Sequence, residues 1–193
     1  MNPVLYSTTR QNWCTPRWLV DIIRSFRPAG IGLDPASNPQ SPVAAATDWR
    51  EGALERSWRG HGLVYLNPPY GRGVGAWTRK AREEFADATG SADELLLLLP
   101  ARVDAIWYQR DVGNCAVCFI KGRIRFLGAA AGATFPSMLV YLGHDHLHFA
   151  EHFSRRGVVM VPATSGGTNV SVIHDLVPAS PTGAKPALIL VEP

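Results

Sequence analysis

The chain has 193 residues, of which 46% are apolar and 18% are charged, and its formal net charge is +3. This size and composition are typical of one globular domain with a buried core. No stretch reaches the roughly 18 apolar residues that a membrane span needs, and the start of the chain, MNPVLYSTTRQNW, lacks the apolar region of a signal peptide. We therefore expect a soluble, cytoplasmic protein without a membrane partner.

Helical and extended patterns alternate over the first part of the chain. Apolar residues at helical spacing predict a helix over residues 16–27, with proline at its first turn and Thr15 as a candidate N-cap. A short buried strand, IGLD, ends at Asp34 and is followed by a proline-rich loop over residues 35–45. A second apolar strand, GLVYLN, ends at Asn67, where the following prolines remove backbone donors.

The middle of the chain continues this alternation. Residues 75–88 predict a surface helix, residues 93–100 an apolar strand covered on both faces, and residues 101–112 a second crossover helix. Residues 116–128 predict two strands that form a hairpin around Lys121-Gly122.

The last third predicts strands over residues 135–143 and 157–162. This succession of elements predicts a three-layer α/β sandwich with a mixed, mostly parallel sheet. Residues 1–162 form the predicted domain. Residues 163–193 are rich in Gly, Ser, Thr and Pro and predict a partly disordered tail, with one docking strand at ALILV.

Cysteine and histidine are interpreted as structural residues. Cys115 and Cys118 lie in an apolar run, at a spacing that faces opposite sides of a sheet, and no second pair completes four zinc ligands. We interpret them as core cysteines rather than a zinc or redox site. The histidine-rich run 144–152 is interpreted as a turn and a short helix with Phe149 and Phe153 on its apolar face, rather than a metal site.

Polar side chains follow two of the predicted strands at the point where each strand ends. Asp34 ends the first strand and Asn67 ends the second. Ligands of open α/β sheets bind beyond the carboxyl ends of the strands. The two residues therefore predict one candidate site at this edge of the sheet.

The turn Asn67-Pro68-Pro69-Tyr70 has the chemistry of a clamp for an amino group. The side-chain oxygen of Asn67 and the carbonyl oxygen of Pro68 are two acceptors that match the two hydrogens of a planar amine. Tyr70 supplies a flat face for a heteroaromatic ring, and the prolines restrict the turn. The alternative interpretation is a rigid turn that ends a strand and carries a packed tyrosine.

Asn-Pro-Pro-Tyr after an apolar strand resembles the catalytic motif of S-adenosylmethionine-dependent amino methyltransferases. The segments NWCTPRWLVDII, LDPASNP, YLNPPYGRGVGAWTRKA, LLPARVDAIWYQ, GRIRF and FPSMLVYL, in that order, are similar to the small phage-type DNA N6-adenine methyltransferases. The resemblance covers residues 12 to about 161. It implies a Rossmann-like αβα methyltransferase sandwich, S-adenosylmethionine as cofactor, DNA as partner, and a phage or prophage protein in a bacterial host.

The resemblance also implies roles for particular residues. The catalytic residues are Asn67, Pro68, Pro69 and Tyr70. The residues implied to bind the cofactor are Thr15, Pro16, Asp34, Ala36, Asp48 and Asn67. Of these, Thr15 and Pro16 match a segment that closes over the methionine part of the cofactor, and Asp48 matches an acidic residue that receives its adenine. The plain alternatives are a helix cap for Thr15, a turn-former for Asp34 and a solvated loop for Asp48.

A target adenine must be flipped out of the duplex before its amino group can reach such a clamp. Basic residues near the predicted site are candidates for phosphate contacts, the alternative being a solvated sheet edge; they are Arg72, Lys80, Arg102, Lys121, Arg123 and Arg125. Other activities remain open for the same turn: methylation of cytosine N4, of guanine in ribosomal RNA or of glutamine in proteins. A relative that binds DNA without catalysis is a further alternative.

Overall fold

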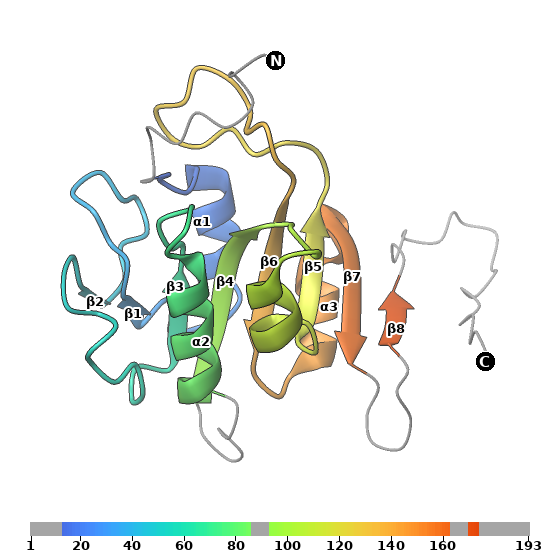
Figure 1. The fold of residues 1–193 in the computed structure, drawn as a ribbon, viewed down its shortest axis with the longest axis horizontal. Helices are drawn as coiled ribbons and strands as arrows, with labels where there is room; N and C mark the ends of the chain where they lie inside the picture. Colours follow the sequence, from blue (N-terminus) through green and yellow to red (C-terminus); the bar gives the residue numbers. More distant parts are fainter. Residues whose placement is uncertain (1–12, 86–92, 163–169, 174–193) are drawn as a thin grey trace.

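The computed structural model describes residues 13–85, 93–162 and 170–173. In these residues one mixed sheet has the strand order β2-β1-β3-β4-β6-β5-β7-β8 (Figure 1). The strands are β1 Leu33–Asp34, β2 Thr47–Asp48, β3 Leu63–Leu66, β4 Glu94–Pro100, β5 Ala116–Ile120, β6 Ser137–Leu142, β7 Gly157–Pro162 and β8 Val170–Ile173. The helices are α1 Arg17–Arg24, α2 Val74–Phe85 and α3 His146–Phe153, with a π-helical turn η2 Tyr108–Val112 and a 3-10 turn η3 Ser154–Arg156.

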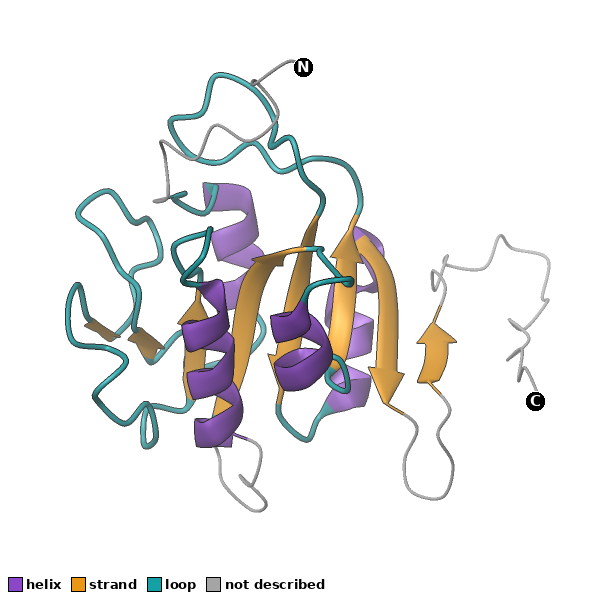
Figure 2. Ribbon diagram, viewed as in Figure 1, coloured by secondary structure: helices purple, strands orange, loops and turns teal. Residues whose placement is uncertain are grey.

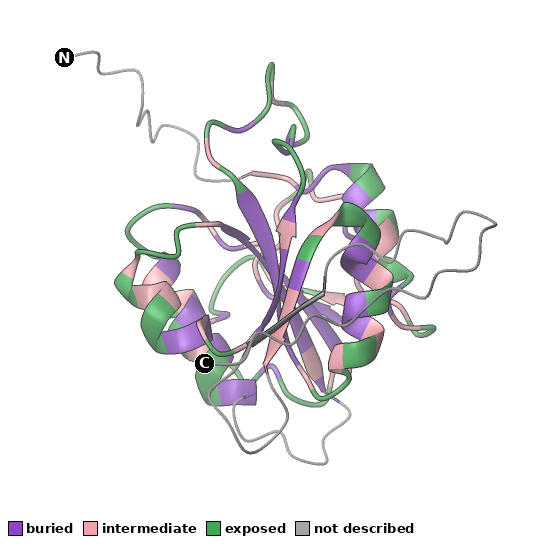
Figure 3. Ribbon diagram, turned by 90° about the vertical axis from the view of Figure 1, so that its right-hand side faces the viewer, coloured by how far each residue is buried: buried purple, intermediate pink, exposed green. Residues whose placement is uncertain are grey.

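Helices cover both faces of the sheet. Helix α2 and the turn η2 lie on one face, and α1 and α3 lie on the other (Figure 2). The view along the sheet shows the same three layers, with the buried faces of the helices turned toward the strands (Figure 3). The predicted three-layer α/β arrangement is therefore confirmed.

The directions of the strands make the sheet mixed. Strands β2, β1, β3 and β4 pair in parallel, whereas β6 pairs antiparallel with both β4 and β5, and β7 pairs antiparallel with β5 and β8. The prediction of a mostly parallel sheet thus holds only for its first half. Because β6 alone separates β4 from β5, these two strands still point the same way. The carboxyl ends of β1, β3, β4 and β5 therefore lie along one edge, at the top of Figure 1.

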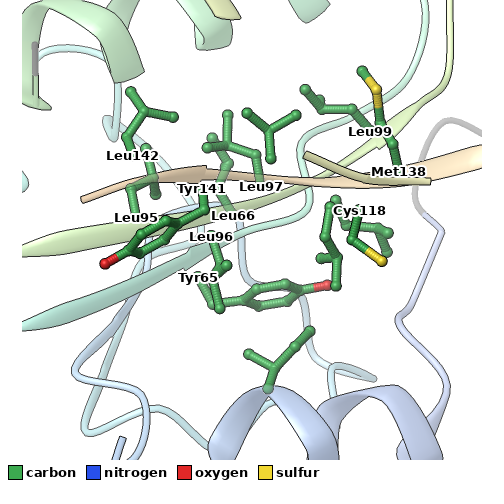
Figure 4. Packing of buried hydrophobic residues seen from close by; sticks show 14 of the residues in the cluster. Tyr65, Leu66, Leu95, Leu96, Leu97, Leu99, Cys118, Met138, Tyr141 and Leu142 are labelled. Atoms are coloured by element: carbon green, nitrogen blue, oxygen red, sulfur yellow. The ribbon is translucent and has the colours of Figure 1, made fainter. Parts of the chain in front are cut away.

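The core is centred on β3 and β4. All five leucines of β4, Leu95 to Leu99, are fully buried, as the prediction of a strand covered on both faces requires. Side chains leave the sheet alternately, so the ring of Tyr65 lies on the face that α1 covers while Leu97 and Leu99 lie on the opposite face (Figure 4). The leucines and Tyr65 together fix the end of β3, from which the candidate site begins.

The predicted hairpin around Lys121-Gly122 is wrong. Strand β5 pairs with β6 on one side and with β7 on the other, so neither of its edges is free for the segment that follows it. Gly122 adopts a left-handed φ of 81°, and the chain leaves the sheet as an irregular loop over residues 121–136. The predicted alternation of side chains persists there, since Arg123 and Arg125 are exposed while Ile124 and Phe126 are buried.

Three smaller differences concern element boundaries. The first helix spans Arg17–Arg24, and the second crossover helix is reduced mainly to the short turn η2. Strand β8, Val170–Ile173, pairs antiparallel with β7 although the sequence places it in the tail. The rest of that tail, including ALILV, lies outside the described residues.

Candidate active site at the carboxyl edge of the sheet

The side chain of Asn67 is hydrogen-bonded to residues 13–15, the segment that precedes α1. Its amide nitrogen donates hydrogen bonds to the carbonyl oxygen of Trp13 and to Thr15 Oγ1, the latter at 3.2 Å. Its other polar atom, Oδ1, is buried and has no hydrogen-bond partner among the residues that the structure describes. Buried polar atoms nearly always have a partner, so an acceptor left open in this way points to a functional site.

Thr15 turns its side chain inward, toward the end of β3. The predicted N-cap role is wrong, because the N-cap of α1 is Pro16 and no side chain caps the helix. Thr15 is only 1% exposed, and its hydroxyl lies 2.7 Å from the hydroxyl of Tyr65. Burial raises the pKa of Tyr65 far above its usual range, so this group stays a neutral hydroxyl.

Tyr70 is packed in this structure. Its ring is 8% exposed, and its hydroxyl donates a hydrogen bond to the carbonyl oxygen of Leu98 at 3.1 Å. Phe126 and Phe135 meet the ring edge to face, with centroids at 6.0 and 5.5 Å. Trp13 packs against the same two phenylalanines. The expectation of an open aromatic face at Tyr70 therefore does not describe this conformation, in which four aromatic rings form one cluster.

A cavity of about 390 Å³ opens beside the Asn67 turn. The loops that follow β1 and β2 supply much of its wall through residues 35–39 and 50–55, and the remaining lining residues are Trp13, Asn67, Pro69 and Trp77. The cavity thus lies beyond the carboxyl ends of the parallel strands, where ligands of such sheets bind.

The residues expected to bind a cofactor are only partly brought together there. Ala36 and Asn67 line the cavity, whereas Thr15, Pro16, Asp34 and Asp48 do not. Asp48 is half exposed and lies 3.7 Å from Arg50, which belongs to the cavity wall.

Asp34 shapes the loop that forms one wall of the cavity. Its two carboxylate oxygens accept hydrogen bonds from the backbone N–H of Ala36 at 3.2 Å and from the hydroxyl of Ser41 at 3.3 Å. The side chain is buried, and this burial raises its pKa to about 6, against the opposing effect of the two hydrogen bonds. The nearby charge of Asp48 adds to the rise. A buried carboxyl with a raised pKa beside a cavity is common at functional sites.

Most of the predicted phosphate-contacting residues are exposed at the carboxyl edge or in the loops that leave it; these are Arg72, Arg102, Lys121, Arg123 and Arg125. Lys80 is not available in the same way. It lies within α2, 2.5 Å from the carboxylate of Glu84. The side chain of Lys80 is 18% exposed and that of Glu84 is 9% exposed. Lys80 is therefore a partner of a buried carboxylate rather than an exposed cation.

The histidine-rich segment forms the predicted short helix, α3, with Phe149 and Phe153 buried. His148 and His152 lie within hydrogen-bond distance of the carbonyl oxygens of Phe26 and Ile22, at 2.9 and 2.8 Å. Within the described ranges, no group of three or more His, Cys, Asp or Glu residues could hold a metal ion. Among the same residues, no helix has the length and apolar character needed to cross a bilayer.

Four residues of the site were not predicted from the sequence. Tyr65 lies two positions before Asn67, and this spacing on a strand places both side chains on one face, a signal that could have identified it. The carbonyl of Trp13 and the rings of Phe126 and Phe135 reach the site from distant segments, and no local pattern indicates their partners.

The comparisons with known proteins identify one family. The family model for DNA N-6-adenine-methyltransferase (Dam) matches residues 4–138. No curated protein and no solved structure gives a significant match. The matched range extends from before α1 to the start of β6 and includes both the Asn67–Tyr70 turn and the cavity wall. Because it spans well over half of the chain, and in agreement with the resemblance seen in the sequence, the protein belongs to the DNA N-6-adenine-methyltransferase (Dam) family.

Proposed function

We propose that the protein transfers a methyl group from S-adenosylmethionine to N6 of an adenine that has been flipped out of DNA. The observation that carries this proposal is the open acceptor Asn67 Oδ1, which is buried at the end of β3 beside a cavity of about 390 Å³. Family membership gives the reaction class, and the orientation of this amide supports the choice of an amino group as target.

The turn acts as a clamp for the amino group. Asn67 Oδ1 and the carbonyl oxygen of Pro68 accept the two hydrogens of the adenine amine, which increases the electron density on the nitrogen. The amide nitrogen of Asn67 is already bound to Trp13 and Thr15. The acceptors therefore need little reorganisation as charge develops on the amine.

The cavity is suited in size and position to the cofactor. Its volume of about 390 Å³ falls within the range of about 300–1,000 Å³ that small-molecule sites occupy. Ala36, Asn67 and Pro69 would contact the cofactor directly, and Asp34 would hold the loop around it. When bound, the cofactor supplies an electrophilic methyl group, which the amino nitrogen takes up as the carbon–sulfur bond breaks and one amino proton leaves to water.

The base would enter through the aromatic cluster. In the described conformation Phe126 and Phe135 pack against Tyr70, and both belong to the loop over residues 121–136. We propose that this loop shifts when DNA binds, so that the flipped adenine replaces a phenylalanine against the Tyr70 ring. Arg123 and Arg125, exposed on the same loop, would contact the phosphates around the flipped nucleotide.

The test is incubation of the purified protein with unmethylated DNA and methyl-labelled S-adenosylmethionine, followed by digestion to nucleosides and identification of the product by mass. The proposal expects N6-methyladenine with the wild-type protein and its loss in Asn67→Ala. Asn114→Ala is the matched control, because Asn114 is exposed and far from the turn in sequence. Methyl transfer to cytosine, or to added RNA or protein, would overturn the substrate but keep the chemistry. Absence of transfer to every acceptor would overturn the proposal.

A further inference from the structure

We infer that Thr15 and Tyr65 are positioning residues that keep the Asn67 amide in its productive orientation. A chain of hydrogen bonds runs from the hydroxyl of Tyr65 through Thr15 Oγ1 to the amide nitrogen of Asn67. This role rests on the proposed methyl transfer to an amino group. It differs from the cofactor contact that the sequence resemblance implies for Thr15.

The orientation of the amide decides whether the clamp works. The oxygen and the nitrogen of an asparagine side chain are nearly the same size, and rotation by half a turn exchanges an acceptor for a donor. If the nitrogen of Asn67 faced the adenine amine, two donors would meet and the amine would lose one of its acceptors. A group that holds the nitrogen on the opposite side therefore acts directly on the rate of transfer.

Two groups hold the nitrogen there. The carbonyl oxygen of Trp13 can only accept, so it must face the amide nitrogen rather than Oδ1. Thr15 Oγ1 receives the second N–H at 3.2 Å. With both of its hydrogens bound, the nitrogen has no donor left for the substrate, and Oδ1 remains the open acceptor.

Thr15 is itself oriented by the core. A threonine hydroxyl rotates, and it could otherwise turn its hydrogen toward the Asn67 amide. The hydroxyl of Tyr65, 2.7 Å away, gives it a second partner and restricts this rotation. Tyr65 is fully buried on β3, with its ring on the α1 face of the sheet (Figure 4), so the position of its hydroxyl is fixed by packing.

The location of Thr15 supports positioning rather than ligand contact. Its side chain is 1% exposed and does not line the 390 Å³ cavity. Trp13, by contrast, lines the cavity and also provides the carbonyl that binds the amide. Cys14, which lies between these two residues, also forms a backbone hydrogen bond, since its carbonyl oxygen accepts the N–H of Leu127 at 2.9 Å.

The experiment compares Thr15→Val, which keeps the shape but removes the hydroxyl, with Thr15→Ser, which keeps the hydroxyl. We expect Thr15→Val to lower kcat about tenfold, the factor that corresponds to one hydrogen bond. The KM for S-adenosylmethionine should stay within about twofold, since no ground-state contact with the cofactor is removed. Thr15→Ser should restore most of kcat. Tyr65→Phe should lower kcat less, and Thr15→Val/Tyr65→Phe should be no slower than Thr15→Val, because both changes act through one bond.

A second readout does not depend on turnover. With isotope-labelled asparagine, the side-chain amide signals of Asn67 are identified by their absence in Asn67→Ala. Thr15→Val should shift these signals and speed their exchange with water, and Thr15→Ser should leave them near the wild-type positions. This result, together with the kcat pattern, supports the positioning role.

Three results would overturn the inference, and they can be told apart. If the wild type is active and Thr15→Val has the same kcat, the positioning role is wrong but the proposed function stands. A raised KM and weaker cofactor binding with intact kcat would make Thr15 a cofactor contact instead. If the amide signals respond as expected but the wild type methylates no acceptor, the proposed function has failed, and the catalytic part of the inference fails with it.

Discussion

The amide nitrogen of Asn67 donates a hydrogen bond to the backbone carbonyl of Trp13, 54 positions earlier in the chain. This bond joins the segment before α1 to the turn after β3. Because a carbonyl oxygen only accepts, a main-chain atom determines which end of the amide stays open. The proposed chemistry of the turn therefore depends on a residue that contributes no side-chain group to the bond.

Asn67→Asp tests this relationship through stability. A carboxylate would place an acceptor against the carbonyl of Trp13, so the variant should lose about 1–3 kcal/mol of unfolding free energy. Repulsion and burial raise the pKa of the new carboxyl in the folded state, so stability is lost as pH rises from about 4, the pKa of an unfolded aspartate, toward the raised value. The fall in Tm relative to the wild type should thus be larger at about pH 8 than at about pH 5. Asn67→Ala is the control, and its loss of stability should not depend on pH. An equal fall in Asn67→Asp at both pH values would contradict the proposed geometry.

Two variants of Tyr70 distinguish the contribution of its ring from that of its hydroxyl. Tyr70→Phe removes the hydrogen bond to Leu98 and should lower the unfolding free energy by about 1 kcal/mol while keeping methyl transfer within a few-fold. Tyr70→Ala removes the surface on which the base is proposed to stack, and transfer should fall by roughly one to two orders of magnitude. Single-turnover rates and denaturant titrations measure the two effects. A large loss of transfer in Tyr70→Phe, with the fold intact, would assign the role to the hydroxyl instead.

The buried carboxyl of Asp34 makes stability depend on pH. Its pKa of about 6 in the folded protein, raised by burial, exceeds the value of 3.8 for a free side chain. The folded state therefore holds the proton longer than the unfolded state, and this group lowers stability as pH rises from about 4 to about 6. Asp34→Asn removes the effect, and Ser41 can rotate its hydroxyl to suit the new amide.

Unfolding free energies of the wild type and Asp34→Asn should thus diverge with pH. The difference should grow in favour of Asp34→Asn by up to about 3 kcal/mol between about pH 4 and pH 7. Denaturant titrations across this range provide the measurement, with Asp104→Asn, at an exposed position, as the control. A difference that does not change with pH would show that Asp34 is not the titrating group.

Lys80 and Arg123 should separate stability from DNA binding. Burial opposes ionisation of Glu84, but hydrogen bonds from Lys80 and Ser57 lower its pKa below the usual value. Lys80→Ala removes one hydrogen-bond donor from this carboxylate and should lower the unfolding free energy by about 1–2 kcal/mol, while the affinity for DNA should change little.

Arg123→Ala should leave the unfolding free energy unchanged and reduce the salt dependence of DNA binding by about one unit of slope. The reverse pattern, measured by thermal unfolding and salt titrations, would return Lys80 to the DNA-contacting set.

Local sequence patterns are sufficient to predict several elements of the fold. The run of leucines predicts a strand that is buried on both faces, because strand pairing in the middle of a sheet requires apolar residues on both sides. The prolines after Asn67 end β3 by removing donors, which is a property of those residues wherever they stand. Even the pairing of Lys80 could have been read from the sequence, since Glu84 follows four positions later on a predicted helix.

Other features depended on the three-dimensional arrangement. The local pattern after β5 predicts a hairpin, but β5 is paired with β6 at one edge and with β7 at the other. The packing of Tyr70 is decided by Phe126 and Phe135, which arrive in a loop more than fifty residues later. Which strands pair and which rings meet is settled by competition among distant segments, and local propensity carries no information about it.

The family, the strand-ending turn and the residue types of the proposed clamp can be recognised from the amino-acid sequence alone. The partners of Asn67 cannot, because folding brings Trp13 and Thr15 to its nitrogen, places Tyr65 beside Thr15, and leaves Oδ1 open. An asparagine side chain has no preferred orientation of its own. Its acceptor and donor ends are assigned by the partners that folding brings to them.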